Sequence, residues 1–150
     1  MKTILVTAFI LFFVQGIDAQ STKKMENNQN DMGAIRVALE QNYFEGIYQG
    51  NVDLLKQIFY PDTLLFGDVN GVPYSKTLVQ YLDGVANRQS PKDSGKPFKG
   101  EIITIKVVNS IAIAEVKVKM YDFYYHDLLS FHRIDGHWFI VNKMLTNSNE

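Results

Sequence analysis

The stretch that decides the fold runs from Glu101 to Leu145 and reads EIITIKVVNSIAIAEVKVKMYDFYYHDLLSFHRIDGHWFIVNKML. β-Branched and aromatic residues dominate it, as is typical of strands. The dipeptides Asn109-Ser110 and Asp135-Gly136 interrupt it, and such dipeptides favour tight turns. We therefore expect an antiparallel meander of four strands, over residues 101–108, 111–121, 124–134 and 137–145.

The segment before this meander carries helical patterns. Apolar residues recur at every fourth position from Ile35 to Ile47, which predicts a helix capped by Asp31 and ended by Gly50. Asn51 is predicted to cap a second helix, and Pro61 stops that helix from continuing.

A short hairpin and a third helix are expected next. Asn70-Gly71 predicts a tight turn between strands at 63–68 and 72–74. Ser75 is predicted to cap a helix that runs to Val85, and a loop follows over 88–99. Three N-terminal helices followed by a meander predict an α+β fold in which the helices cover one face of the sheet.

The chain as a whole has the composition of one globular domain. It has 150 residues, of which 46% are hydrophobic and 21% charged, and its net charge is -1. With acidic and basic side chains interspersed, this charge argues against nucleic acid as a partner. The chain has no cysteine, so disulfides and a lipid-bearing cysteine are both excluded.

The first residues have the pattern of an export signal. Lys2 precedes a short apolar run over 4–14, and Ala19 suits cleavage before Gln20. We expect a signal peptide over 1–19, a flexible leader over 20–30, a domain over 31–146 and a tail over 147–150. The protein would then be secreted or periplasmic, with no membrane contact after cleavage; a tethered or buried N-terminal helix is the alternative.

The hairpin at Asp135-Gly136 predicts which side chains share a face. A two-residue turn pairs Phe131 with Ile140 and Leu129 with Asn142. One face then carries Asp127, Leu129, Phe131, Trp138, Ile140 and Asn142, and the other carries Leu128, Ser130, His132, Phe139 and Val141. Both faces are largely apolar. The helices cover one of them, so we expect a homodimer through the other, outer face.

Four segments together are similar to a known family. They are Tyr43-Phe44-Glu45-Gly46-Ile47, Phe59-Tyr60-Pro61-Asp62, the block from Phe66 to Tyr74 and the ending from Asp135 to Lys143. Their order and spacing, over Met32 to Leu145, resemble the lumazine-binding branch of the nuclear transport factor 2-like superfamily. The resemblance implies a cone-shaped fold of three helices packed on a strongly bent, mainly antiparallel sheet. That superfamily includes ketosteroid isomerase, dehydratases, polyketide cyclases and non-catalytic binding proteins, and the fold alone does not choose among them.

Enzymes of this superfamily place a carboxylate and hydroxyl donors inside an apolar cone, and the sequence offers candidates for such a site. Asp127 is the candidate general base or protonated donor, with Tyr43 and Asn142 as donors to an oxyanion. The ligand would contact an apolar wall made of Tyr48, Phe66, Leu129, Phe131, Trp138 and Ile140. The alternative places Asp127 in solvent at a strand end and Tyr43 in the core.

Metal and cofactor sites are not expected. His126 and His132 lie six residues apart on one strand, roughly 20 Å at about 3.3 Å per residue, which is too far for one metal. His132 and His137 are closer, but no carboxylate completes their face. Two functional classes follow: a pocket that binds a small apolar or aromatic molecule, or a cofactor-free lyase or isomerase. A third alternative is a dimeric interaction module with a closed cavity.

Overall fold

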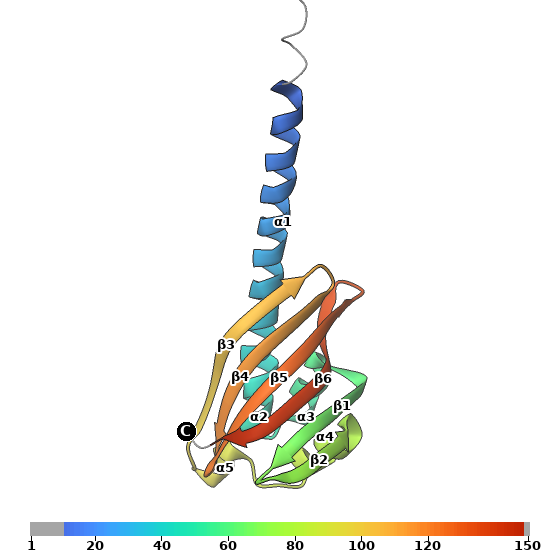
Figure 1. The fold of residues 1–150 in the computed structure, drawn as a ribbon. Helices are drawn as coiled ribbons and strands as arrows, with labels where there is room; N and C mark the ends of the chain where they lie inside the picture. Colours follow the sequence, from blue (N-terminus) through green and yellow to red (C-terminus); the bar gives the residue numbers. More distant parts are fainter. Residues whose placement is uncertain (1–10, 149–150) are drawn as a thin grey trace, which may run out of the picture.

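The computed structural model of the protein describes the backbone of residues 11–148 and the side chains of residues 21–148 (Figure 1). Its helical elements are α1 (Leu11–Ala38), the π-helix η1 (Leu39–Phe44), α2 (Glu45–Gln49), α3 (Val52–Ile58), α4 (Leu78–Ala86) and α5 (Pro91–Ser94). Its strands are β1 (Phe59–Val69), β2 (Val72–Thr77), β3 (Phe98–Val108), β4 (Ile111–Met120), β5 (Phe123–Ile134) and β6 (His137–Ser148).

The strands form one six-stranded sheet in the order β2-β1-β6-β5-β4-β3. Every neighbouring pair is antiparallel except β1 and β6, which run parallel. The predicted meander is confirmed, with strand limits that differ by a few residues. Asn70 and Asp135 both have positive φ, followed by Gly71 and Gly136, as a type I′ turn requires. The α+β fold class predicted from the sequence is therefore confirmed.

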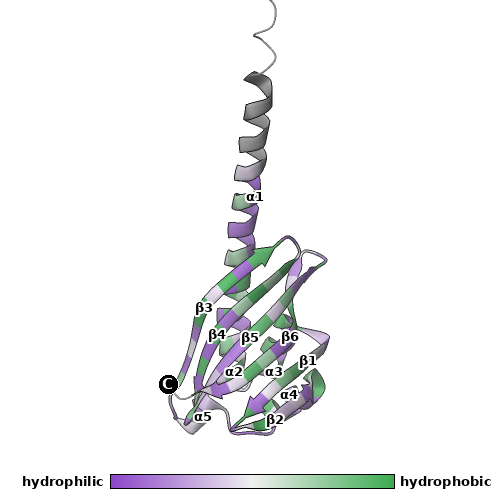
Figure 2. Cartoon of the chain, in the orientation of Figure 1, coloured by the Kyte–Doolittle hydropathy of each residue, from purple (hydrophilic) through white to green (hydrophobic). Residues whose placement is uncertain are grey.

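The helices pack on one face of the sheet and bury a single core (Figure 1). Ile35, Leu39, Tyr43 and Ile47 supply the helical side of this core, as their spacing predicts. Polar and apolar residues alternate along β3 to β6 (Figure 2), so the inner face is buried while the outer face is partly exposed.

The first helix begins much earlier than predicted. It runs through residues 20–30, which the sequence predicts as a leader outside the fold, and it projects beyond the sheet (Figure 1). The prediction that Asp31 caps this helix is wrong. Asp31 lies inside α1, where its carboxylate accepts hydrogen bonds from Arg133 at 2.9 and 3.1 Å and from Trp138 Nε1 at 3.2 Å. Asp31 therefore ties α1 to the β5–β6 hairpin.

The other helix ends can be compared with their predicted caps. Gly50 ends α2 with a φ of 67°, and the Asn51 side chain accepts from two backbone N–H groups of α3, so both predictions are confirmed. The prediction for Ser75 is wrong, because Ser75 pairs with Phe66 in the sheet. Thr77 caps α4 instead, in a reciprocal capping box with Gln80.

Residues 1–10 of the predicted signal peptide and residues 149–150 of the predicted tail lie outside the described residues, and β6 continues to Ser148. Among residues 11–148, no helix combines the length and the apolar character needed to cross a membrane.

Candidate functional site

A β-bulge between β5 and β6 decides which residues reach the site. The two strands pair as predicted from Ile134 and His137 as far as Phe131 and Ile140, but Ser130 then pairs with Asn142. Val141 is the extra residue, and beyond it every side chain of β6 changes face relative to the regular ladder. Leu129 consequently faces Lys143, so the predicted pairing of Leu129 with Asn142 is wrong.

The bulge creates a buried triad of Tyr43, Asp127 and Lys143, which come from η1, β5 and β6. The Tyr43 hydroxyl donates to Asp127 Oδ2 at 2.7 Å, and Lys143 Nζ donates to Asp127 Oδ2 at 2.9 Å and to the Tyr43 oxygen at 2.6 Å. Tyr43 and Asp127 are 0% exposed and Lys143 is 6% exposed. A π-helical turn such as the one that carries Tyr43 is uncommon and occurs often at functional sites.

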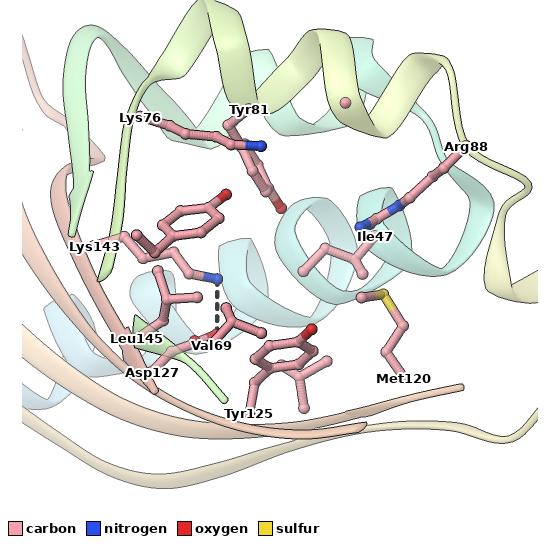
Figure 3. A pocket seen from close by; sticks show the side chains of 13 residues that line it. Ile47, Val69, Lys76, Tyr81, Arg88, Met120, Tyr125, Asp127, Lys143 and Leu145 are labelled. Atoms are coloured by element: carbon pink, nitrogen blue, oxygen red, sulfur yellow. Dashed lines mark hydrogen bonds and ion pairs between the residues drawn. The ribbon is translucent and has the colours of Figure 1, made fainter. Parts of the chain in front are cut away.

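Two members of the triad, Asp127 and Lys143, line a cavity of about 200 Å³ that lies between α4 and the sheet (Figure 3). Asp127 and Lys143 reach it from the sheet, while Tyr81 and Gly84 reach it from α4. The remaining lining residues are Ile47, Val69, Tyr74, Lys76, Arg88, Val118, Met120, Tyr125 and Leu145. The cavity thus combines an apolar wall with tyrosine hydroxyls and four charged side chains.

Two charged groups of this lining have hydrogen-bonding capacity left over. Asp127 Oδ1 is buried and has no hydrogen-bond partner among the described residues. Arg88 is half-buried, and its Nε and Nη2 atoms are buried and equally without a partner in that part of the chain. Buried polar groups are rarely left unpaired, because removing them from water without a hydrogen bond costs free energy. Both residues line the cavity, so a molecule bound there is the candidate partner for these atoms.

The tyrosines of the site act as neutral donors near neutral pH. Burial, followed by the charge of Asp127, raises the pKa of Tyr43 well above 10.0. Burial likewise raises the pKa of Tyr74, Tyr81 and Tyr125, although the charge of Arg88 lowers each of them in part. Each hydroxyl therefore keeps its proton: Tyr43 donates its hydrogen bond to Asp127, and Tyr74, Tyr81 and Tyr125, which line the cavity, can donate theirs to a ligand.

The structure brings together two of the three residues predicted to be catalytic. Asp127 and Tyr43 form a direct hydrogen bond. Asn142 lies on the outer face, where its side-chain amide donates to the Leu64 carbonyl at 3.1 Å. Lys143 takes the inward place that the sequence predicts for Asn142. The regular alternation of the strand places Lys143 on the outer face, and only the bulge turns it inward.

The residues predicted to form the apolar wall do not line the cavity. Leu129, Phe131, Trp138 and Ile140 are buried in the core, and the cavity lining does not include them. The other two predicted wall residues, Tyr48 and Phe66, also lie outside the lining. The Tyr48 ring packs on Phe98 with 5.3 Å between ring centroids, and Phe66 is 43% exposed on the outer face. Apolar alternation along the strands thus identified core residues rather than the cavity wall.

The histidines stand apart from this site. His126 Nε2 lies 2.7 Å from Glu115 Oε1 on the outer face of the sheet. In the described part of the chain, no three His, Asp or Glu side chains converge in a group that could hold a metal ion.

Comparison with known proteins adds a family and a fold. Residues 30–146 match the family described as "Putative lumazine-binding". A protein named Aldolase FrzH, from Cladobotryum sp, is 29% identical over 110 residues, which cover 72% of this chain and 85% of that protein.

Three crystal structures of nuclear transport factor 2-like proteins have the same fold. The one from Silicibacter pomeroyi DSS-3 has a TM-score of 0.72 at 18% identity, covering 80% of this chain and 98% of that chain. Those from Shewanella baltica OS155 and Methylobacillus flagellatus KT have TM-scores of 0.70 and 0.71 at 22% and 23% identity. They cover 81% and 80% of this chain, and 96% and 94% of their own.

Proposed function

Because the chain belongs to the family described as "Putative lumazine-binding", with a nuclear transport factor 2-like fold, we propose that it is an exported protein that binds a small apolar or aromatic molecule. One observation carries the proposal. A cavity of about 200 Å³ is bordered by buried charged atoms, on Asp127 and Arg88, that no described residue satisfies. Ligand pockets typically combine such convergent polar groups with an apolar wall.

The lining suggests the size and character of the ligand. Tyr74, Tyr81 and Tyr125 offer ring faces and edges, which favour an aromatic partner. The volume lies below the roughly 300–1,000 Å³ of pockets that take drug-sized molecules, so the ligand is small. An open cavity also counts against the alternative of an interaction module filled by its own side chains.

Gly84 of α4 offers a direct test, because it lines the cavity and is itself exposed. A Cβ built there meets only the Lys76 amine, at 4.0 Å, so a side chain can enter the cavity without a clash. Replacing a helical glycine also favours folding by about 0.5–1 kcal/mol. Gly84→Leu should therefore stabilise the protein while it blocks binding, and Gly84→Ala is the matched control.

Titration calorimetry with a panel of small aromatic probes, including lumazine and benzamide, provides the measurement. We expect the wild type and Gly84→Ala to bind at least one probe, and Gly84→Leu to bind it at least about tenfold more weakly. Equal affinities in all three proteins would place binding outside the cavity. If the wild type bound no probe, the proposal of an aromatic ligand would fail.

A second candidate is a cofactor-free lyase or isomerase, which the similarity to an aldolase and the buried triad both favour. Asp127 Oδ1 would accept a proton from the carbon next to a carbonyl, and the Lys143 ammonium group would stabilise the resulting enolate oxygen. Tyr43 would position both groups, because it bonds to each of them. Deuterium uptake from D₂O into cyclohexanone, lost in Asp127→Asn, would support this activity.

Export rests on the sequence of the first residues, which has the pattern of a signal peptide. Secretion of the full chain from a host cell should give a mature protein whose intact mass matches a chain that begins at Gln20. An uncleaved chain retained by the cell would contradict this part of the proposal.

We also propose a homodimer through the outer face of the sheet. Partly exposed apolar residues cover that face, namely Leu64, Phe66, Ile111, Ile113, Leu128 and Met144. A second copy fits it best, because Glu115 and Lys117 lie among these residues and a two-fold axis can pair unlike charges. Sedimentation should show a dimer for the wild type and a monomer for Leu128→Glu; a monomeric wild type would refute it.

A further inference from the structure

Arg88 is one of two charged residues of the cavity lining, with Lys76, that the triad does not involve. It follows α4 by two residues and turns its guanidinium group into the cavity, on the opposite side from Asp127 and Lys143 (Figure 3). Its Nε and Nη2 atoms are both buried, and neither has a hydrogen-bond partner among the described residues. The chain therefore keeps a positive charge at the cavity whose Nε and Nη2 donors are unused among the described residues.

These two nitrogens have a particular geometry. Nε and Nη2 share one edge of the planar guanidinium group, and their N–H bonds point the same way. An edge of this kind matches the two oxygens of a carboxylate, which it binds through two parallel hydrogen bonds. A neutral carbonyl group offers only one oxygen to the same edge. The two unpartnered atoms therefore match a carboxylate in particular.

The remaining charges of the cavity do not compensate Arg88. Asp127 is the acidic residue of the lining, and its ion pair is with Lys143, at 2.9 Å. Lys76 adds a further positive charge, with its amine 5.1 Å from the centre of the Tyr74 ring. The cavity thus has an excess of positive charge, which attracts an anionic ligand.

We infer that Arg88 binds the carboxylate group of the ligand, which makes the ligand a small aromatic carboxylic acid. The inference rests on the proposed function and adds the chemical class of the ligand to it. The aromatic ring lies among Tyr74, Tyr81 and Tyr125, and the carboxylate meets the Nε and Nη2 edge of Arg88. Neutral aromatic molecules of the same shape bind to the same cavity without this contact.

Benzoate and benzamide provide a matched pair of probes, since they share a ring and differ in charge. Titration calorimetry is performed on the wild type, Arg88→Met and Lys92→Met. Lys92→Met is the control, because it removes an exposed positive charge that does not line the cavity. We expect the wild type and Lys92→Met to bind benzoate about 10- to 100-fold more tightly than benzamide.

In Arg88→Met this preference should disappear, because benzoate loses the two-oxygen contact that benzamide cannot make. A cooperative urea-unfolding transition close to that of the wild type shows that the variant is folded. If Arg88→Met kept the preference, or if the wild type bound both probes equally, the inference would be overturned and pocket binding would stand. If the wild type bound neither probe, both the inference and the proposal of a small aromatic ligand would be overturned.

Discussion

Replacing the buried ion pair of Asp127 and Lys143 should separate its role in function from its role in stability. Lys143→Met leaves the Asp127 carboxylate in the core with Tyr43 as its partner and with Oδ1 still unpaired. Asp127→Leu leaves the Lys143 ammonium group in the core with Tyr43 as its remaining acceptor. Each single variant therefore buries an uncompensated charge.

The expected magnitudes follow from the burial of the pair. Removing one partner of a buried ion pair costs about 3–5 kcal/mol, whereas replacing both by apolar residues of similar volume is often neutral or stabilising. The double variant leaves the Tyr43 hydroxyl without an acceptor, which costs about 1–3 kcal/mol. We expect the double variant to lie within about 2 kcal/mol of the wild type, with a coupling energy of at least about 4 kcal/mol.

Equilibrium unfolding in urea measures these free energies. Trp138 is the single tryptophan of the chain and is buried, so its fluorescence reports unfolding. The chain has no cysteine, so oxidation of thiols does not complicate the measurement. We further expect the double variant to retain binding of aromatic probes, because Tyr74, Tyr81, Tyr125 and Arg88 are unchanged, and to lose the deuterium uptake that depends on Asp127. Additive losses of stability, with the double variant as unstable as the sum of the two, would refute this account of the pair.

Three other perturbations test particular contacts. Burial raises the pKa of Tyr43 well above 10.0, so the folded chain keeps a proton that the unfolded chain loses near pH 10. The contribution of Tyr43 to stability should therefore be full below that pH and fall above it. Between about pH 8 and 11, the urea midpoint should fall less steeply in Tyr43→Phe than in the wild type. Gly67→Ala should lower the free energy of unfolding in urea by about 3 kcal/mol or more, because residue 67 has a φ of 152° and the added Cβ would lie 1.7 Å from the Leu145 carbonyl oxygen. A loss of stability below about 1 kcal/mol would contradict this close approach. Asp31→Ala should speed amide hydrogen exchange in the last turns of α1, because it removes the bonds to Arg133 and Trp138; unchanged exchange would show that they do not hold the helix.

Much of the fold could be predicted because local signals and global packing agree. The turn at Asp135-Gly136 has the backbone conformation that its residues favour, and the four strands follow from their composition. The helix over Ile35 to Ile47 follows from its apolar spacing. The start of α1 could not be predicted in this way, because residues 20–30 are polar and lack a helical period.

The candidate site could be predicted only in part. Asp127 and Tyr43 were predictable because each lies on the buried face of its own element. Lys143 was not, since a one-residue bulge has no signature in the sequence around Val141 and reverses the facing of every later residue. Arg88 follows a helix in a segment predicted to be a loop, and only the tertiary structure places its guanidinium group at the cavity.

Native mass spectrometry of the protein recovered from the cells that produce it tests the central claim, that the cavity holds a small molecule. Gly84→Leu, produced in the same way, is the comparison. We expect the wild type to carry a stoichiometric small aromatic acid that Gly84→Leu lacks. A bare polypeptide in both samples, or the same adduct in both, would contradict the claim.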